Sequence, residues 1–181
     1  MVGQGFNDFL GIGEETTWGT AVARTAYLEV NDESLVDNEE FIESASLRSA
    51  GMRTNRSVQG PIDPSGTIVF EAQFEGWELF LKHAMGTVTT TQLDSTTGTD
   101  AYRHVFTMSQ PLPTGLTLHV NKDPQAFNFV GGMISSLNFS VSVGGFLLVT
   151  ADVFCKEAIK ATSADTPTFS SSDLVTVALG S

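Results

Sequence analysis

Three histidines and one cysteine are the side chains most able to do chemistry in this sequence, so their spacing tests for a catalytic or metal site. His83, His104 and His119 lie in separate segments, and none belongs to an HExxH pattern that would hold zinc. A lone histidine on a strand or helix is usually at a surface or interface, and we expect that placement here. Cys155 continues an apolar stripe, which favours a buried thiol over a nucleophile.

Acidic pairs and closely spaced glycines are the remaining candidates for chemistry. Glu14-Glu15 and Glu39-Glu40 are neighbouring carboxylates in predicted loops, where such pairs are mostly solvated charge. The N-terminal stretch GQGFNDFLGIG lacks the GK[ST] ending of a phosphate-binding loop, and the sequence has no GxSxG pattern. We therefore predict that this protein is not an enzyme and uses no metal or cofactor.

The composition is that of a folded, strand-rich chain. Its 181 residues suit one domain, and with 41% hydrophobic and only 17% charged residues much of the polarity comes from Ser, Thr, Asn and Gly. Nine basic residues against 21 acidic ones give a net charge of -12, which excludes a protein that simply grips nucleic acid or an anionic bilayer. The N-terminus lacks a signal-peptide pattern, so we expect an intracellular origin.

Alternation of apolar and polar residues predicts the strands that must carry any functional surface. These strands are residues 66–76, 102–108 and 115–121, followed by a hairpin of residues 136–143 and 146–154. Gly144-Gly145 predicts a tight two-residue turn in that hairpin. One face of the hairpin is apolar, whereas the other is small and wet, with Ser136, Asn138, Ser140, Ser142, Thr150 and Asp152.

One segment, residues 76–86, departs from the two-residue period. Its apolar side chains have helical spacing and are Trp77, Phe80, Leu81 and Ala84. Glu78 and Lys82 are spaced for an i,i+4 ion pair, and Gly86 is placed to end the helix. We expect a single short helix that packs on the sheet through its Trp77 stripe.

Two segments have weaker patterns. In residues 36–64, Asp37 to Glu40 resembles a helix cap, but the Ser- and Gly-rich remainder favours an extended, mobile connection. Because long irregular loops are commonly functional, we interpret it as an assembly arm with four apolar or cationic contact residues, Met52, Arg53, Arg56 and Val58. Residues 161–181 form a Ser/Thr linker with a strand-like end at 174–179, which pairs with a neighbour or begins a second domain.

Several motifs occur in an order that resembles the major tail tube proteins of long-tailed (siphovirus-type) bacteriophages. The motifs are GIGEETTWGT (11–20), IESASLR (42–48), GTIVFE (66–71), LFLKHAMG (79–86), LPTGLTL (112–118) and GGMISSL (131–137). Each is weak alone, and their order across residues 11–157 is the stronger observation. We therefore expect a tail tube domain in residues 1–160, with an N-terminal arm and first strand in 1–30 and the assembly loop in 36–64.

The resemblance implies a mainly antiparallel β-sandwich or partial barrel with one flanking helix. Subunits of that family join sheets edge to edge as six-fold rings, and the rings stack into the tube through which genomic DNA leaves the virion. Longer members with two tube domains form three-fold rings. The implied partners are further copies of the chain, the tape measure, terminator and distal tail proteins, and passing DNA, in a virion tail assembled in the host cytoplasm.

A DNA channel should present no cations to the phosphates, and the wet hairpin face meets this condition. We therefore predict that it lines the lumen, together with Glu71 and Gln73 of the 66–76 strand. The alternative for this face is a plain solvent-exposed sheet surface. Alternatives for the protein are another ring-forming tail component, such as a distal tail or terminator protein, and a carbohydrate- or ligand-binding β-barrel. Trp18 and Trp77 fall in a loop and a helix, which weakens the sugar-binding alternative.

Overall fold

The computed structural model describes residues 8–45, 56–93, 101–122, 125–171 and 174–176. Its body is one antiparallel sheet with strand order β2-β1-β9-β10-β11-β6-β3, and β12 pairs with β10 beside this path. The strands are β1 (Leu10–Glu14), β2 (Ala26–Leu28), β3 (Asp32–Glu33), β6 (Ser65–Glu71), β9 (Leu116–Lys122), β10 (Gln125–Ser140), β11 (Leu148–Phe154) and β12 (Glu157–Lys160).

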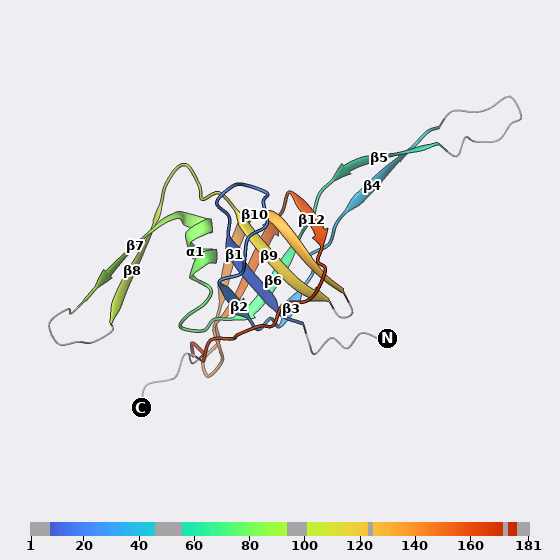
Figure 1. Ribbon diagram of the computed structural model, residues 1–181. Helices are drawn as coiled ribbons and strands as arrows, with labels where there is room; N and C mark the ends of the chain where they lie inside the picture. Colours follow the sequence, from blue (N-terminus) through green and yellow to red (C-terminus); the bar gives the residue numbers. More distant parts are fainter. Residues whose placement is uncertain (1–7, 46–55, 94–100, 123–124, 172–173, 177–181) are drawn as a thin grey trace, which may run out of the picture.

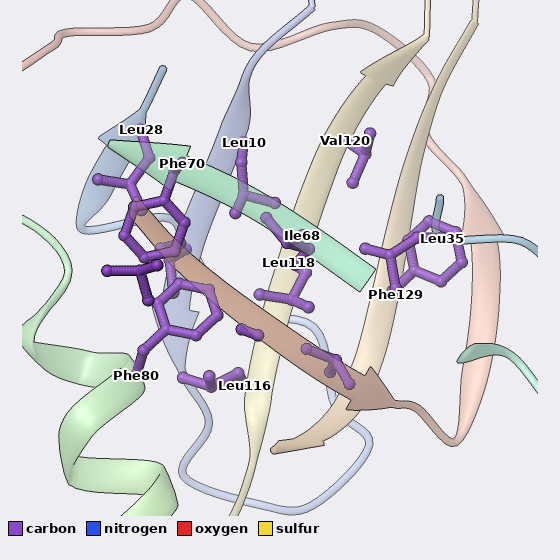
Figure 2. Packing of buried hydrophobic residues seen from close by; sticks show 14 of the residues in the cluster. Leu10, Leu28, Leu35, Ile68, Phe70, Phe80, Leu116, Leu118, Val120 and Phe129 are labelled. Carbon is purple, nitrogen blue, oxygen red and sulfur yellow. The ribbon is translucent and has the colours of Figure 1, made fainter. Parts of the chain in front are cut away.

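The long strand β10 connects the two halves of the body. Its first part pairs with β9 and β12, and its second part pairs with β11 from Met133 onward, with a register shift between Ile134 and Ser136. The sheet bends over a core to which both halves contribute (Figure 2), with Leu118 and Phe129 from one half and Ile68 and Phe70 from the other. The predicted β-sandwich or partial barrel with one short helix is confirmed.

The predicted helix is α1 (Glu78–Met85), which packs beside the core with Phe80 pointing into it (Figure 2). Phe80 is fully buried and its ring centroid lies 5.4 Å from that of Phe70. Gly86 ends the helix with φ +122°, a conformation that side-chain-bearing residues rarely adopt. The expected Glu78–Lys82 pair is wrong, because Glu78 accepts the Gly76 N–H and Lys82 bonds to Glu14 on β1. Within the described ranges, no helix is long and apolar enough to cross a membrane.

Two hairpins project from the body on opposite sides (Figure 1). One is the arm, β4 (Glu39–Glu43) with β5 (Ser57–Ile62), and the other is β7 (Gly86–Gln92) with β8 (Tyr102–Met108). Over residues 39–43 and 57–62 a strand pair therefore replaces the expected irregular connection, and there is no helix cap at its start, whereas residues 46–55 lie outside the described residues. Strand pairing wins because Phe41, Ile42 and Val58 favour strands over helix. β8 was predicted, whereas β7 was not.

The strand pattern was too simple at two places. The predicted 66–76 strand ends at Glu71, and Gln73 keeps only an isolated bridge, to Leu174. The β10–β11 connection is longer than a two-residue turn, since β10 ends at Ser140 and β11 begins at Leu148. Gly144 has a positive φ of 78°, but Gly145 does not, and the Gly145 N–H bonds to Ser142 at 2.9 Å.

The C-terminal segment lies against the body. Arg24 pairs with Asp165, Tyr27 donates a hydrogen bond to the same carboxylate at 3.2 Å, and the Asp165 N–H donates to His119 Nε2 at 3.2 Å. Further along, the backbone of Val175 bonds to Ala72 and Leu147, so it fills the gap between the ends of β6 and β11. Residues 161–176 therefore include more than a solvated linker.

Candidate channel face and assembly surfaces

The predicted wet face exists as one continuous surface of β10, β11 and β6, on the side opposite the core. Strand register places its residues in three cross-strand rows, which are Ser136–Asp152–Thr67, Asn138–Thr150–Val69 and Ser140–Leu148–Glu71. Residues directly opposite one another share a face of the sheet. Neither Lys nor Arg occurs in these rows. We call these nine residues the polar face.

Asp152 is the fixed charge of the polar face. Thr67 Oγ1 donates a hydrogen bond to its Oδ1 at 2.8 Å, and the Ser136 hydroxyl donates to Oδ2. The bond from Ser136, and then that from Thr67, lowers the pKa of Asp152 below its ordinary value, because both favour the ionised carboxylate. The Ser136–Asp152–Thr67 row, at one end of the polar face, therefore stays negative near neutral pH.

Two predicted residues are not on the polar face. Gln73 is only 9% exposed, beyond the end of β6, so its predicted place on an open wet surface is wrong for this chain. Its backbone carbonyl accepts the Trp77 indole N–H at 2.6 Å, which ties the segment to the start of α1. Ser142 is exposed but lies past the end of β10, in the connection to β11.

The arm exposes apolar side chains on both of its faces. Ile42 and Val58 are direct cross-strand partners and are 59% and 70% exposed, while Phe41, on the other face opposite Gln59, is 58% exposed. The Ser44 N–H bonds to the Arg56 carbonyl at 2.8 Å, so the ladder continues past β5, and Arg56 lies two residues from Val58 on the same face. Met52 and Arg53, the other predicted arm contacts, lie outside the described residues.

The β7–β8 hairpin is the second projecting element, and alternation in the sequence predicted only β8. Thr87 to Thr91 is a run of β-branched residues, which was the available sign of β7. The hairpin exposes Met108 (81%) as well as Tyr102 and Val105. Like the arm, it contributes no residue to the buried core cluster of the described residues.

Glu15, which was expected to be solvated, organises the loop between β1 and β2. It is buried and accepts hydrogen bonds from the Gly19 N–H at 2.6 Å, the Gly131 N–H at 2.8 Å and the Thr117 hydroxyl at 2.9 Å. Trp18 donates its indole N–H to the Gly131 carbonyl, and Gly131 has φ +66° with no room for a Cβ beneath that ring. The GEETTWGT motif is therefore structural, with the Glu15 carboxylate holding the loop in place through these hydrogen bonds.

Most of the side chains able to do chemistry, the three histidines and Cys155, are buried by packing. His83 and His119 are buried, contrary to the surface placement expected for them, whereas His104 is exposed. Burial lowers the pKa of His83, because it disfavours the imidazolium, and raises the pKa of Cys155 to about 12. His119 Nδ1 lies 2.7 Å from the Asn128 amide oxygen. The described part of the chain contains no group of three or more His, Cys, Asp or Glu side chains able to hold a metal ion.

A cavity of about 610 Å³ opens between α1, β2, β8 and the C-terminal segment. We call it the flank pocket. Its walls include five aromatic side chains, which are Tyr27, Phe74, Trp77, Phe106 and Phe169. Glu75 and Glu78 also line it, and no Lys or Arg is among its lining residues.

Comparison with known proteins agrees with this architecture. The family model described as phage tail tube protein matches residues 5–181. No curated protein matches the chain in sequence. Among solved structures, the chain is similar to the sheath/tube terminator of an extracellular contractile injection system, PVC, with 12% identity, a TM-score of 0.50, and 87% of this chain and 94% of that chain covered. It is also similar to the tube terminating cap of the anti-feeding prophage, with 10% identity, a TM-score of 0.51, and coverage of 87% and 89%.

Proposed function

The chain belongs to the phage tail tube protein family, and from this premise we propose that its copies join as rings that stack into a tube for genomic DNA. It is a structural tail tube protein. Within the tube, the polar face lines the bore, the arm bridges successive rings, and α1 lies on the outer flank. The protein acts without catalysis, as a conduit assembled in the host cytoplasm. The assembled tube contacts the tape measure, terminator and distal tail proteins.

The polar face is the observation that carries this proposal. Its rows combine hydroxyl and amide groups with the carboxylates of Asp152 and Glu71 and two apolar side chains, Val69 and Leu148, and they contain no cation. Binding to DNA comes mainly from Lys and Arg contacts to phosphates, so a surface without them holds the duplex weakly. Fixed negative charges add repulsion, which keeps the duplex away from the wall.

Charge introduced on the polar face tests its position. Asn138→Lys with Ser140→Lys adds two cations at exposed positions, so tubes should form but should retain DNA and deliver it poorly. Asn138→Asp with Ser140→Asp is the matched control, because it changes the same positions with the opposite sign and should preserve delivery. Tubes are counted by negative-stain microscopy, DNA retention by co-sedimentation, and delivery by infectivity. Equal delivery by both variants would show that the polar face does not line the bore.

The arm's proposed bridging role has a separate test. Deleting Gly51–Gly60 removes most of β5, and since no residue of β4 or β5 belongs to the described core cluster, the body should remain folded. Such a chain should stay monomeric or stop at single rings under conditions in which the full chain forms tubes. Normal tubes from the deleted chain would refute the role of the arm.

A terminator or distal tail protein remains the second candidate, because both solved structures described above show this fold in proteins that terminate tubes. Microscopy of the concentrated wild-type protein separates the candidates. Long hollow tubes support the tube role, isolated rings support the terminator or distal role, and persistent monomers oppose both.

A further inference from the structure

The exposed arm and the flank pocket lie on opposite sides of the molecule and have complementary surfaces. The arm extends away from the body on one side, and α1, β2 and β8, which line the flank pocket, lie on the other side (Figure 1). A copy therefore does not fill its own pocket with its own arm. A contact between the two features must join different copies in a head-to-tail manner, and such contacts build closed rings or open, repeating assemblies.

The arm presents a compact apolar group with a cation beside it. Ile42 and Val58 are cross-strand partners, so their side chains stand together on one face of the hairpin. Arg56 lies on that face two residues away, is exposed, and has no resolved ion pair among the described residues. Glu40 shares this face on the other side of Ile42, so the positive charge is confined to the end nearer the tip. Between Ser44 and Ile62 the sequence has three arginines and no acidic residue, whereas the chain as a whole carries a net charge of -12.

The flank pocket offers the opposite properties. Phe74 is 71% exposed at its wall, and Trp77, Tyr27 and Phe106 supply further aromatic surface. Glu75 and Glu78 provide negative charge that no lining Lys or Arg neutralises. A volume of about 610 Å³ falls within the usual range for a binding cavity, roughly 300–1,000 Å³, and exceeds what two aliphatic side chains need.

We propose that the Ile42–Val58 face of one copy inserts into the flank pocket of the next copy, with Arg56 facing Glu75 and Glu78. This inference rests on the proposed bridging role of the arm and names the surface that receives it. Burial of the aliphatic pair against the aromatic walls supplies attraction, and the charges set register and exclude the reverse contact. Phe41 and Gln59, on the other face of the arm, remain outside the pocket.

Disulfide trapping between two separately purified variants tests the contact directly. Val58→Cys mixed with Phe74→Cys should give a covalent heterodimer on mild oxidation, because a disulfide forms only when the two Cα atoms come within about 7 Å. Gln59→Cys is the matched control, since it lies next to Val58 but on the opposite face of the arm. We expect at least about tenfold less heterodimer from it. The native Cys155 is buried and contributes little background.

Charge exchange gives a second, independent readout. Arg56→Glu should raise the critical concentration for assembly at least about tenfold, because it places like charges together in the contact. Adding Glu75→Arg to the same chain should restore assembly, whereas adding Glu157→Arg, which makes the same change of charge at an exposed position on β12, should not. Restoration by the first pair alone supports the contact, and its absence contradicts it.

These measurements separate the inference from the proposed function. If wild-type protein forms tubes but Val58→Cys and Gln59→Cys give equal yields with Phe74→Cys, the pocket is not the receptor and the tube role stands. If wild-type protein gives no tubes or rings while the Val58–Phe74 heterodimer forms selectively, the contact stands and the tube role fails. Absence of the selective heterodimer overturns the inference in every case.

Discussion

The body and the arm are built from the same kind of strand, yet they use their apolar residues in opposite ways. In the body, Phe70 is fully buried among Phe80, Trp77 and the facing strands. In the arm, Phe41 is more than half exposed although it is also a strand phenylalanine. A two-stranded hairpin has no interior, so its apolar side chains do little for the stability of a single copy. Exposed apolar residues of this kind are typical of interaction surfaces, which is the role that we propose for the arm.

Removing an apolar side chain should lower stability most in the body. Phe70→Ala should lower the free energy of unfolding by about 3–5 kcal/mol, because it removes a large buried ring and leaves a cavity beside Phe80. Urea denaturation of the monomer, followed by tryptophan fluorescence, measures the loss. A loss below about 1 kcal/mol would mean that the core collapses around the gap or is less tightly packed than the structure indicates.

Glu15 gives the next largest effect, and it extends the comparison from apolar to polar groups. Glu15→Ala leaves the Gly19 N–H, the Gly131 N–H and the Thr117 hydroxyl without their buried acceptor, which should cost about 2–4 kcal/mol. Glu29→Ala, at an exposed position near β2, is the control and should stay within about 0.5 kcal/mol of wild type. Similar losses from both variants would contradict the organising role of Glu15.

The C-terminal segment is intermediate between body and arm, so its attachment should be weaker and pH-dependent. The bond from Arg24 is the largest cause of a lowered pKa at Asp165. A lowered folded pKa stabilises the folded form above the unfolded value of about 3.9, and this contribution is lost as pH falls through the folded pKa. Asp165→Asn should therefore weaken the attachment by about 1 kcal/mol from pH 7 to about pH 5, and the difference from wild type should shrink at lower pH.

Hydrogen exchange of the backbone amides in residues 161–171 measures this attachment. Thr166→Ala, beside Asp165 but exposed, is the matched control and should exchange like wild type. A difference between Asp165→Asn and wild type that stays constant below about pH 3 would show that charge at Asp165 is not what holds the segment.

Sequence patterns predicted the parts of the fold that depend on local periodicity. The α1 helix and the β10–β11 hairpin follow from apolar spacing, because one face of each is turned to the core. β8 and β9 also follow from alternation, although β8 is largely exposed and β9 is buried on both faces. The polar face was also predictable in outline, since Ser136, Asn138, Thr150 and Asp152 alternate with core residues. Only register could add Thr67 to it, because that residue comes from a strand more than sixty residues away.

The remaining features depend on contacts that no local pattern contains. Glu15 looks like any acidic loop residue until Thr117 and Gly131 are brought beside it from β9 and β10. The buried positions of His83 and His119 have the same origin, because tertiary packing covers faces that alternation alone would leave to solvent. The arm was predicted as an interacting segment but not as a hairpin, since its turn signals were spread over a long Ser- and Gly-rich stretch.

The smallest expected effect on stability belongs to the arm, where the same kind of substitution removes an exposed side chain. Phe41→Ala and Ile42→Ala should each leave the free energy of unfolding of the monomer within about 0.5 kcal/mol of wild type, because neither side chain is buried. Phe41→Ala is thus the counterpart of Phe70→Ala, with the same substitution in a strand that has no core.

The two arm variants should differ only when copies meet. Ile42 shares a face with Val58 and Phe41 does not, so Ile42→Ala should raise the critical concentration for assembly about tenfold or more, and Phe41→Ala should raise it less. Light scattering across a dilution series measures both. Equal shifts would mean that both faces of the arm are covered by neighbours, and a loss of monomer stability in either variant would mean that the arm packs on its own body in solution.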